Sequence, residues 1–134
     1  AIASNLAAKY YDLNIIQKEF QDSKNNVTRF LVMSKDQLEI GLDEKNTMMT
    51  LIFKVRSIPA ALYKSLGGFA SNGVNITKLE SYIHPQGFDV AHFYIDFEGH
   101  PENKSVKLAI DEMKFFCEEI DILGVYKISD FRKK

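Results

Sequence analysis

The sequence contains one cysteine, three prolines and no tryptophan among its 134 residues. A single thiol, Cys117, excludes an internal disulfide and a cysteine-rich zinc site, and it fits a reducing compartment, most simply the cytoplasm. Lysine and arginine number 17 against 18 acidic residues, a balance that gives no electrostatic case for binding nucleic acid or an anionic membrane. No apolar run approaches the roughly 20 residues that a membrane-spanning helix needs, and the N-terminus has no signal-peptide pattern.

What remains is the composition of a globular protein, with 46% hydrophobic and 26% charged residues. The first ten residues have helical spacing, because Ile2, Leu6 and Tyr10 recur on one face. The chain begins with Ala1 rather than methionine. Two interpretations stay open: the chain is cut from a longer one, or a start methionine has been removed before a small residue.

Residues 1–35 predict a helix followed by two strands, at 13–20 and 27–33, with turn-forming residues between the strands. One helix and two strands close off little apolar surface, so this part makes a poor domain alone. Residues 36–46 are mostly polar and charged. We interpret them as a linker that leads into a second part of the chain.

Residues 47–134 have clearer periodicities. Alternating apolar residues predict strands at 48–55, 74–83, 88–97 and 122–128. Helical spacing predicts one helix that begins at Pro59 and ends at Asn72-Gly73, and another with an apolar stripe from Val106 to Cys117. The order β-α-β-β-α-β predicts an α+β, ferredoxin-like domain with one antiparallel four-stranded sheet and both helices on one face.

Spacing alone predicts no catalytic group, no metal site and no cofactor. The three histidines lie far apart and lack the spacing of metal ligands: they are His84, His92 and His100. Cys117, on the apolar stripe of the second helix, is expected to be a buried packing residue. Spacing therefore describes an α+β domain without assigning its role.

Two pairs of residues have simple structural interpretations. Gly67-Gly68 is either a close-packing site or a weak point in the first helix of the second part. Glu118-Glu119 is expected to form a solvated helix end. Neither pair predicts a function.

Two stretches carry more information: Asn26-Val27-Thr28-Arg29-Phe30, and residues 73–81, which read Gly-Val-Asn-Ile-Thr-Lys-Leu-Glu-Ser. Together they resemble prephenate dehydratase. That family has a Thr-Arg-Phe motif near the end of its catalytic domain, followed by an ACT regulatory domain with Gly-Ala-Leu and Glu-Ser-Arg-Pro motifs. The resemblance covers essentially the whole chain. It implies that residues 1–35 end a catalytic domain, that 36–46 are a linker and that 47–134 form an ACT domain.

The resemblance implies a lyase of phenylalanine biosynthesis that converts prephenate to phenylpyruvate, water and CO2 without a cofactor. It assigns Thr28 as the hydroxyl that donates a hydrogen bond to the departing oxygen. Arg29 either pairs with a substrate carboxylate or holds the neighbouring strand, and Phe30 packs. The family's site lies between two lobes, of which this chain holds the last piece, so we expect the chain alone to be inactive.

The resemblance also implies that the ACT domain binds L-phenylalanine as a feedback effector. The helix N-terminus after Pro59 suits a carboxylate, and Leu62 and Ile76 can line an apolar slot. The expected effector-binding residues are Pro59, Ala60, Ala61, Leu62, Asn75, Ile76, Thr77, Glu80 and Ser81. Association into a homodimer or homotetramer through the ACT domains is expected as well.

The sequence departs from the family motifs at two places. Ala60 stands where the family has glycine, which adds a methyl group where the backbone can approach a ligand. Tyr82-Ile83 stands where the family has arginine and proline, so a planar cation is lost.

Two other functions therefore stay open. One is a non-catalytic amino-acid sensor that uses residues 1–35 as a docking arm. The other is an ACT-like domain that only dimerises. The sequence also does not distinguish prephenate from arogenate as the substrate.

Overall fold

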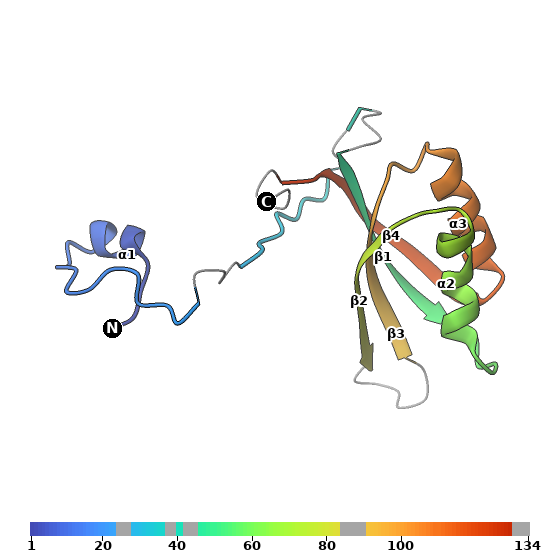
Figure 1. The fold of residues 1–134 in the computed structure, drawn as a ribbon, viewed down its shortest axis with the longest axis horizontal. Helices are drawn as coiled ribbons and strands as arrows, with labels where there is room; N and C mark the ends of the chain where they lie inside the picture. The colour runs from blue at the N-terminus through green and yellow to red at the C-terminus, as the bar shows by residue number, and fades with distance from the viewer. Residues whose placement is uncertain (24–27, 37–39, 42–45, 84–90, 130–134) are drawn as a thin grey trace. The chain divides into compact units, whose positions relative to one another are not determined.

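A computed structural model describes residues 1–23, 28–36, 40–41, 46–83 and 91–129 of the chain (Figure 1). The chain divides into two compact units, Ala1–Ser34 and Lys35–Lys134. The expected linker begins one residue after this division, and most of it, at 37–39 and 42–45, lies outside the described residues. Over the described ranges, none of the helices has the length and apolar character needed to cross a bilayer.

The first unit contains one short helix, α1 (Asn5–Tyr10). The Ser4 side chain accepts a hydrogen bond from the backbone N–H of Ala7 at 3.1 Å, which caps the helix N-terminus. The helix predicted within the first ten residues is therefore confirmed. Its apolar face is exposed, since Leu6 is 73% and Tyr10 82% accessible.

The two strands predicted in the first unit are wrong. Residues 13–20 and 28–33 form no strand, and residue 27 lies outside the described residues. Ile16 and Val32 are almost fully exposed. A strand needs a neighbouring strand for its backbone N–H and C=O groups and a surface for its apolar side chains, and the described part of this unit offers neither.

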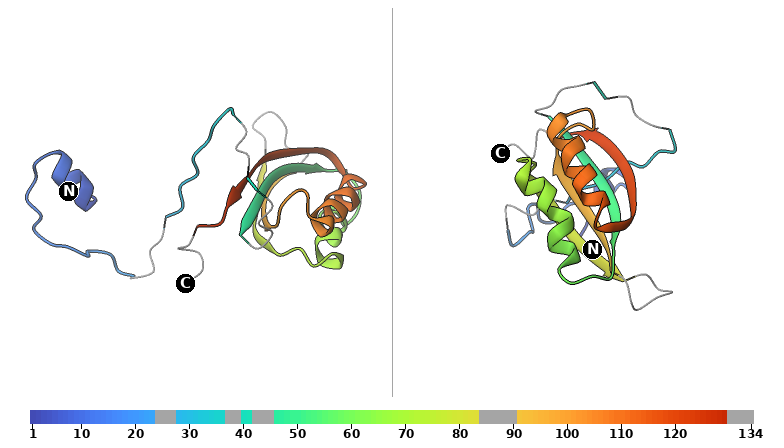
Figure 2. Two further views of the ribbon diagram at one scale, coloured as in Figure 1. Left: turned by 90° about the horizontal axis from the view of Figure 1, so that it is seen from above. Right: turned by 90° about the vertical axis from the view of Figure 1, so that its right-hand side faces the viewer.

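The second unit has the elements β1 (Thr47–Val55), α2 (Ala61–Ser71), β2 (Ile76–Ile83), β3 (Ala91–Glu98), α3 (Lys104–Lys114) and β4 (Cys117–Lys127). The strands form one antiparallel sheet in the order β2-β3-β1-β4. Both helices cover the same face of this curved sheet (Figure 2). The predicted ferredoxin-like βαββαβ domain is confirmed.

The core lies between the sheet and the two helices. Met49, Leu51 and Phe53 of β1 are buried in it, as the strand alternation predicts. The rings of Phe69 and Phe97 meet edge to face, with centroids 4.9 Å apart. The stripe of α3 is buried over the same core by Val106, Ala109, Ile110 and Met113.

The second helix of this unit ends earlier than predicted. Helix α3 stops at Lys114, and Cys117 is the buried first residue of β4. A tight turn, in which the N–H of Phe116 donates to the carbonyl of Met113 at 3.0 Å, lets Phe116 and Cys117 continue the helical spacing outside the helix. The burial of Cys117 is confirmed, but its placement on the helix is wrong.

Glu118 and Glu119 do not form a helix end, because both lie in β4. The Nζ of Lys54, on the neighbouring strand β1, lies 2.7 Å from the Glu118 carboxylate and 3.9 Å from that of Glu119. The hydrogen bond to Glu118 and the charges of both carboxylates raise the pKa of Lys54, against a smaller opposing effect of desolvation. Glu118 and Glu119 of β4 therefore hold the ammonium group of Lys54, which lies on the neighbouring strand β1.

Candidate functional site

The first turn of α2 has no side-chain cap. Its N-cap, Ala60, adopts the left-handed conformation with φ 57° and ψ 29°. Pro59 therefore lies outside the helix rather than at its first position. The N–H of Ala61 donates to the carbonyl of Ile58 at 3.2 Å. Because no side chain caps this end, the remaining N–H groups of the first turn, together with the positive end of the helix dipole, can receive a carboxylate.

The chain enters β2 through a left-handed glycine. Gly73 has φ 66°, as predicted for the residue after a helix, and the N–H of Val74 donates to the carbonyl of Phe69 at 2.8 Å. The carbonyl of the exposed Asn75 accepts a hydrogen bond from the N–H of Glu98 at 2.9 Å. The first of these bonds closes the end of α2, and the second fixes the start of β2 to the end of β3.

A bulge follows directly. Ile76 pairs with Phe97 and Lys78 with Asp96, so Thr77 is the extra residue. The Thr77 hydroxyl donates to the carbonyl of Asp96 at 3.1 Å. This hydroxyl is therefore engaged with β3.

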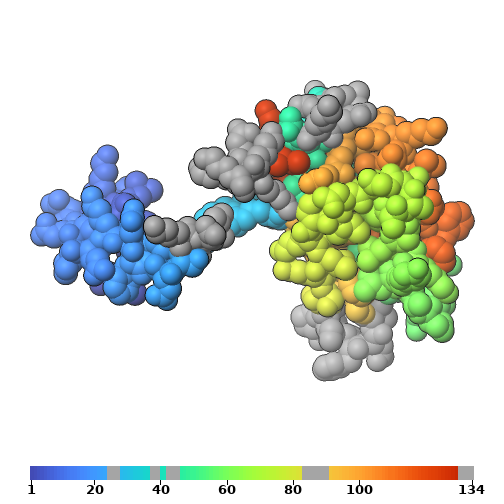
Figure 3. All heavy atoms as spheres, viewed as in Figure 1, coloured from blue at the N-terminus to red at the C-terminus, as the bar shows by residue number. Residues whose placement is uncertain are grey.

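Leu62 and Ile76, the residues expected to line an apolar slot, are both half-buried and pack against the hydrophobic core of the second unit. Pro59 and Ala60 are exposed at the end of α2, while Ala61 is buried. Figure 3 shows the residues of α2, in green, on the visible surface of the second unit. The structure thus combines a helix N-terminus with apolar groups that have one side in the core.

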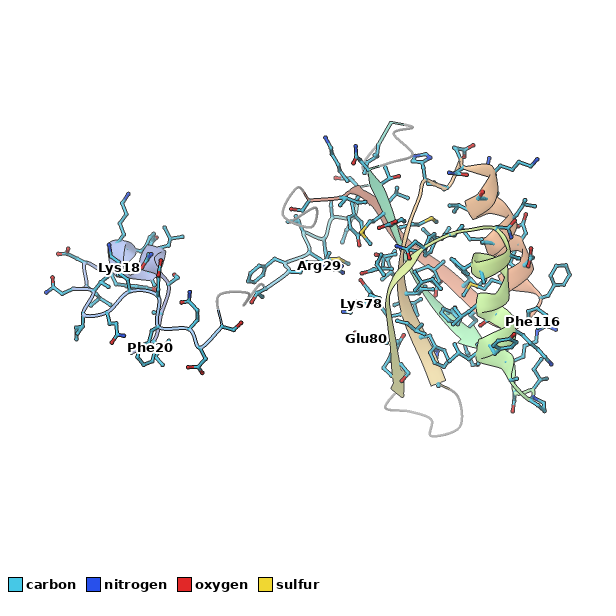
Figure 4. All side chains as sticks on the ribbon, in the orientation of Figure 1. Lys18, Phe20, Arg29, Lys78, Glu80 and Phe116 are labelled. Carbon is cyan, nitrogen blue, oxygen red and sulfur yellow. The ribbon has the colours of Figure 1, made fainter. Side chains whose placement is uncertain are left out.

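The side chains of Glu80 and Ser81 do not lie on the same face of the sheet. Glu80 lies opposite Tyr94 and Ser81 opposite Phe93, so their side chains point to opposite faces of the sheet. Lys78 and Glu80 project away from the helices (Figure 4), and Lys78 Nζ lies 3.1 Å from the Glu80 carboxylate. Tyr82, on the same face as Glu80, stacks on His92 at 5.4 Å between centroids. Glu80 therefore belongs to the open face of the sheet, away from α2.

Thr28, Arg29 and Phe30 lie in the first unit, in an exposed stretch that is neither helix nor strand. Phe30 is 85% exposed and so does not pack as expected among the described residues. Arg29 has an interaction within the structure. The three residues of the Thr-Arg-Phe motif are thus surface groups of this unit.

Sequence reasoning missed a polar network on the open face of the sheet. Asp96 of β3 is completely buried, and the Thr50 hydroxyl donates to its carboxylate at 2.5 Å. The hydroxyls of Thr50 and Tyr126 lie 3.0 Å apart. Burial raises the pKa of Tyr94, and its hydrogen bond to the Asp96 carboxylate raises it further. Alternation predicts only a solvent-facing position for Asp96, and no local signal reveals this network.

The remaining candidates are Cys117 and the possible metal ligands. Burial raises the pKa of the Cys117 thiol to about 11, and the charge of Arg56 opposes this rise only in part. His84 lies outside the described residues. Within the described ranges, no cluster of histidine, cysteine, aspartate and glutamate can hold a metal ion.

Comparisons with known proteins match both units. Residues 1–38 match the family model described as prephenate dehydratase. The chain is 44% identical over 134 residues to a bifunctional N-acyl-homoserine lactone acylase/prephenate dehydratase of Komagataeibacter europaeus, covering 100% of this chain and 48% of the relative. It is 39% identical over 126 residues to a bifunctional chorismate mutase/prephenate dehydratase of Aquifex aeolicus, covering 94% of this chain and 34% of the relative.

Solved structures agree. A quorum quenching acylase, GqqA, superposes with a TM-score of 0.65 and 46% identity over 75% of this chain and 35% of that one. A prephenate dehydratase from Arthrobacter aurescens in complex with L-Phe superposes with a TM-score of 0.57 and 26% identity, over 69% of this chain and 30% of that one.

The second unit is thus a ferredoxin-like α+β domain, the fold of ACT domains. Over its whole length the chain is similar to part of curated prephenate dehydratases, and its residues 1–38 match the model of that family. It spans about half, or less, of the length of the curated relatives that it matches.

Proposed function

We propose that this chain is the C-terminal part of a prephenate dehydratase whose ACT domain binds L-phenylalanine as a feedback effector. The observation that carries the proposal is the order of two features along one chain. Residues 1–38 match the family model, the second unit follows with a ferredoxin-like sheet, and curated relatives align across both. The single cysteine fits a cytoplasmic enzyme.

In the proposed reaction, prephenate loses CO2 and its ring hydroxyl and becomes phenylpyruvate. The Thr28 hydroxyl donates a hydrogen bond to the departing oxygen. The guanidinium of Arg29 pairs with a substrate carboxylate. Both residues are exposed in the first unit.

In the proposed effector site, the carboxylate of phenylalanine binds the uncapped N-terminus of α2 at Ala60 and Ala61. Its ring lies against Leu62 and Ile76, whose other sides contact the core. The ammonium group binds the carbonyl of Asn75, which has a second lone pair besides the one that accepts from Glu98. The Arthrobacter aurescens relative was solved with L-Phe, which supports this ligand.

We further propose association into a homodimer or homotetramer through the ACT domains. Strand β4 is one edge of the sheet, and its Ile122 and Leu123 are 54% and 46% exposed. Exposed apolar groups on an edge strand favour pairing with another chain. Sedimentation velocity at rising concentration tests this, and a monomer throughout would contradict it.

A thermal-shift titration with L-phenylalanine tests the effector assignment. A ligand at one hundred times its dissociation constant stabilises the folded state by ~2.7 kcal/mol, several degrees for a domain of this size. We expect a rise with L-phenylalanine and little with L-alanine. Phenylpyruvate formation from prephenate, and phenylalanine formation from arogenate, test the enzymatic assignment separately in the longer protein.

A second candidate activity comes from the Komagataeibacter europaeus relative, which is named as an acylase as well as a dehydratase and is 44% identical over this whole chain. Release of homoserine lactone from an N-acyl-homoserine lactone by the longer protein would support it. Failure to release it, with dehydratase activity present, would leave the dehydratase assignment alone.

A further inference from the structure

His100 is a buried histidine that the proposed function does not use. It lies in the loop between β3 and α3 and is 8% exposed. The preceding residue, Gly99, has φ 131°, and its N–H donates to the carbonyl of Thr47 at 2.9 Å. On the other side, the N–H of Asn103 donates to the carbonyl of His100 at 2.9 Å. The backbone of His100 is therefore held on both sides.

Both ring nitrogens of His100 have partners. Nδ1 lies 3.1 Å from the backbone N–H of Glu102, which donates to it. Nε2 lies 3.2 Å from the carbonyl oxygen of Ile40. A nitrogen that accepts from an N–H carries no proton, so the neutral ring has its proton on Nε2 and donates it to Ile40. The contacts thus define one tautomer.

The partner of Nε2 connects this loop to the residues before β1. Ile40 belongs to the connecting segment, residues 35–46, which leads into β1. On the other side, His100 is two residues from Glu98, whose N–H donates to the carbonyl of Asn75 in the proposed effector site. A chain of two hydrogen bonds and three consecutive residues therefore joins Asn75 to Ile40.

We propose that His100 is a positioning residue that couples the effector end of β2 to the connecting segment, by donating Nε2–H to the carbonyl of Ile40. The coupling rests on the proposed effector site, whereas the contact itself does not. An effector that displaces Asn75 shifts the end of β3 through Glu98, and the His100 ring transmits this shift to Ile40. The charged groups at this loop are Glu102 and Lys107, and Lys107 Nζ lies 2.6 Å from the Glu102 carboxylate. The contact to the carbonyl of Ile40 is made by the imidazole of His100.

Two substitutions distinguish the hydrogen bond made by Nε2 from the one made by Nδ1. In His100→Gln, the amide N–H can replace Nε2–H and still reach Ile40. In His100→Asn, the shorter side chain can accept from Glu102 N–H, as Nδ1 does, but cannot reach Ile40. Loss of one such hydrogen bond is expected to raise the fraction of molecules in which the Ile40 carbonyl is not bonded to residue 100 by about two- to tenfold.

The test is NMR on the whole 134-residue chain. Without ligand, we expect the His100 ring in the Nε2–H tautomer. We also expect the Ile40 carbonyl-carbon and Gly41 amide signals to be shifted in His100→Asn and retained in His100→Gln. The Nδ1–H tautomer, or identical Ile40 signals in all three proteins, would overturn the contact itself. The tautomer is read in the unsubstituted chain, so it decides even if one variant fails to fold.

With L-phenylalanine, we expect the signals of Ala60 and Ile76 to move in all three proteins. Those of Ile40 should move only in the unsubstituted chain and in His100→Gln. If Ala60 and Ile76 move but Ile40 responds equally in His100→Asn, the coupling is wrong. If Ala60 and Ile76 do not move, the effector site is wrong, and the coupling through His100 falls with it, while the ligand-free signals still decide the contact.

Discussion

Gly68 of α2 lies so close to α3 that a Cβ atom added to it would sit 2.8 Å from the carbonyl oxygen of Ala109. The Cβ of Glu112 would also be 2.8 Å away. A backbone oxygen moves only if α3 moves, so Gly68→Ala is expected to destabilise the domain by about 1–3 kcal/mol. Urea unfolding followed by circular dichroism measures this loss.

The neighbouring glycine provides a matched control. A Cβ on Gly67 would meet nothing within 4 Å. Gly67→Ala is therefore expected to stabilise the domain by about 0.5–1 kcal/mol, because alanine loses less backbone entropy in a helix. Equal effects of the two substitutions would mean that the two helices do not pack as described.

The network around Asp96 predicts coupling between β1 and β4. Thr50 gives its only hydroxyl proton to Asp96, so Tyr126 must donate to Thr50. Thr50→Val is expected to cost about 1–3 kcal/mol, because the buried carboxylate loses a donor. In a double-mutant cycle with Tyr126→Phe, we expect a coupling of about 0.5–1.5 kcal/mol. Strictly additive losses would contradict the Thr50–Tyr126 bond.

Replacing Ala60 by glycine, the residue that the family motif has at this position, is expected to stabilise the domain. A non-glycine residue in the left-handed region costs roughly 1–2 kcal/mol, and Ala60 has φ 57°. Ala60→Gly removes this cost but frees the unfolded chain, so we expect a net gain of up to about 1 kcal/mol. Ala61→Gly, one residue further into the helix, is expected to destabilise. A loss in Ala60→Gly would show that the left-handed conformation is not adopted.

The burial of Cys117 predicts that its thiol reacts slowly with alkylating reagents. With a pKa of about 11 in place of 9.0, the thiolate fraction of Cys117 at pH 8 falls about 100-fold. Alkylation by iodoacetamide should therefore be at least that much slower in the folded protein than in urea, and Cys117→Ala should not react. Because the folded pKa is the higher one, the stability from this group is present below about pH 9 and is lost as pH rises toward about 11. Equal rates folded and unfolded would contradict the burial.

The sequence predicted the second unit well, because apolar residues repeat there with strand and helix periods that a packed core enforces. The end of α3 was misplaced since Phe116 and Cys117 fit a helical spacing although they follow its last turn. Asp96 was missed because alternation places it on the open face, where a carboxylate is ordinarily solvated. The strands of the first unit failed for another reason: β-branched residues favour a strand only where another strand can pair with it.

The candidate site was predicted in outline only. Helical spacing predicted a helix start at Pro59, one residue before the N-cap Ala60, and the resemblance to prephenate dehydratase suggested the apolar pair Leu62 and Ile76. The opposite orientations of Glu80 and Ser81 depend on the register of β2 against β3, and the bulge at Thr77 sets that register. Register across a bulge is a tertiary property, so motif residues quoted as one group can face different sides of a sheet.

The effector site is decided by a two-dimensional NMR titration of the chain with L-phenylalanine, observing backbone amides and methyl groups. We expect saturable shifts at Ala60, Ala61, Leu62, Asn75 and Ile76, with a much weaker response to L-alanine. No shift up to millimolar ligand would contradict it. So would shifts confined to the open face around Glu80 and Tyr82, because the ligand would then bind away from the end of α2.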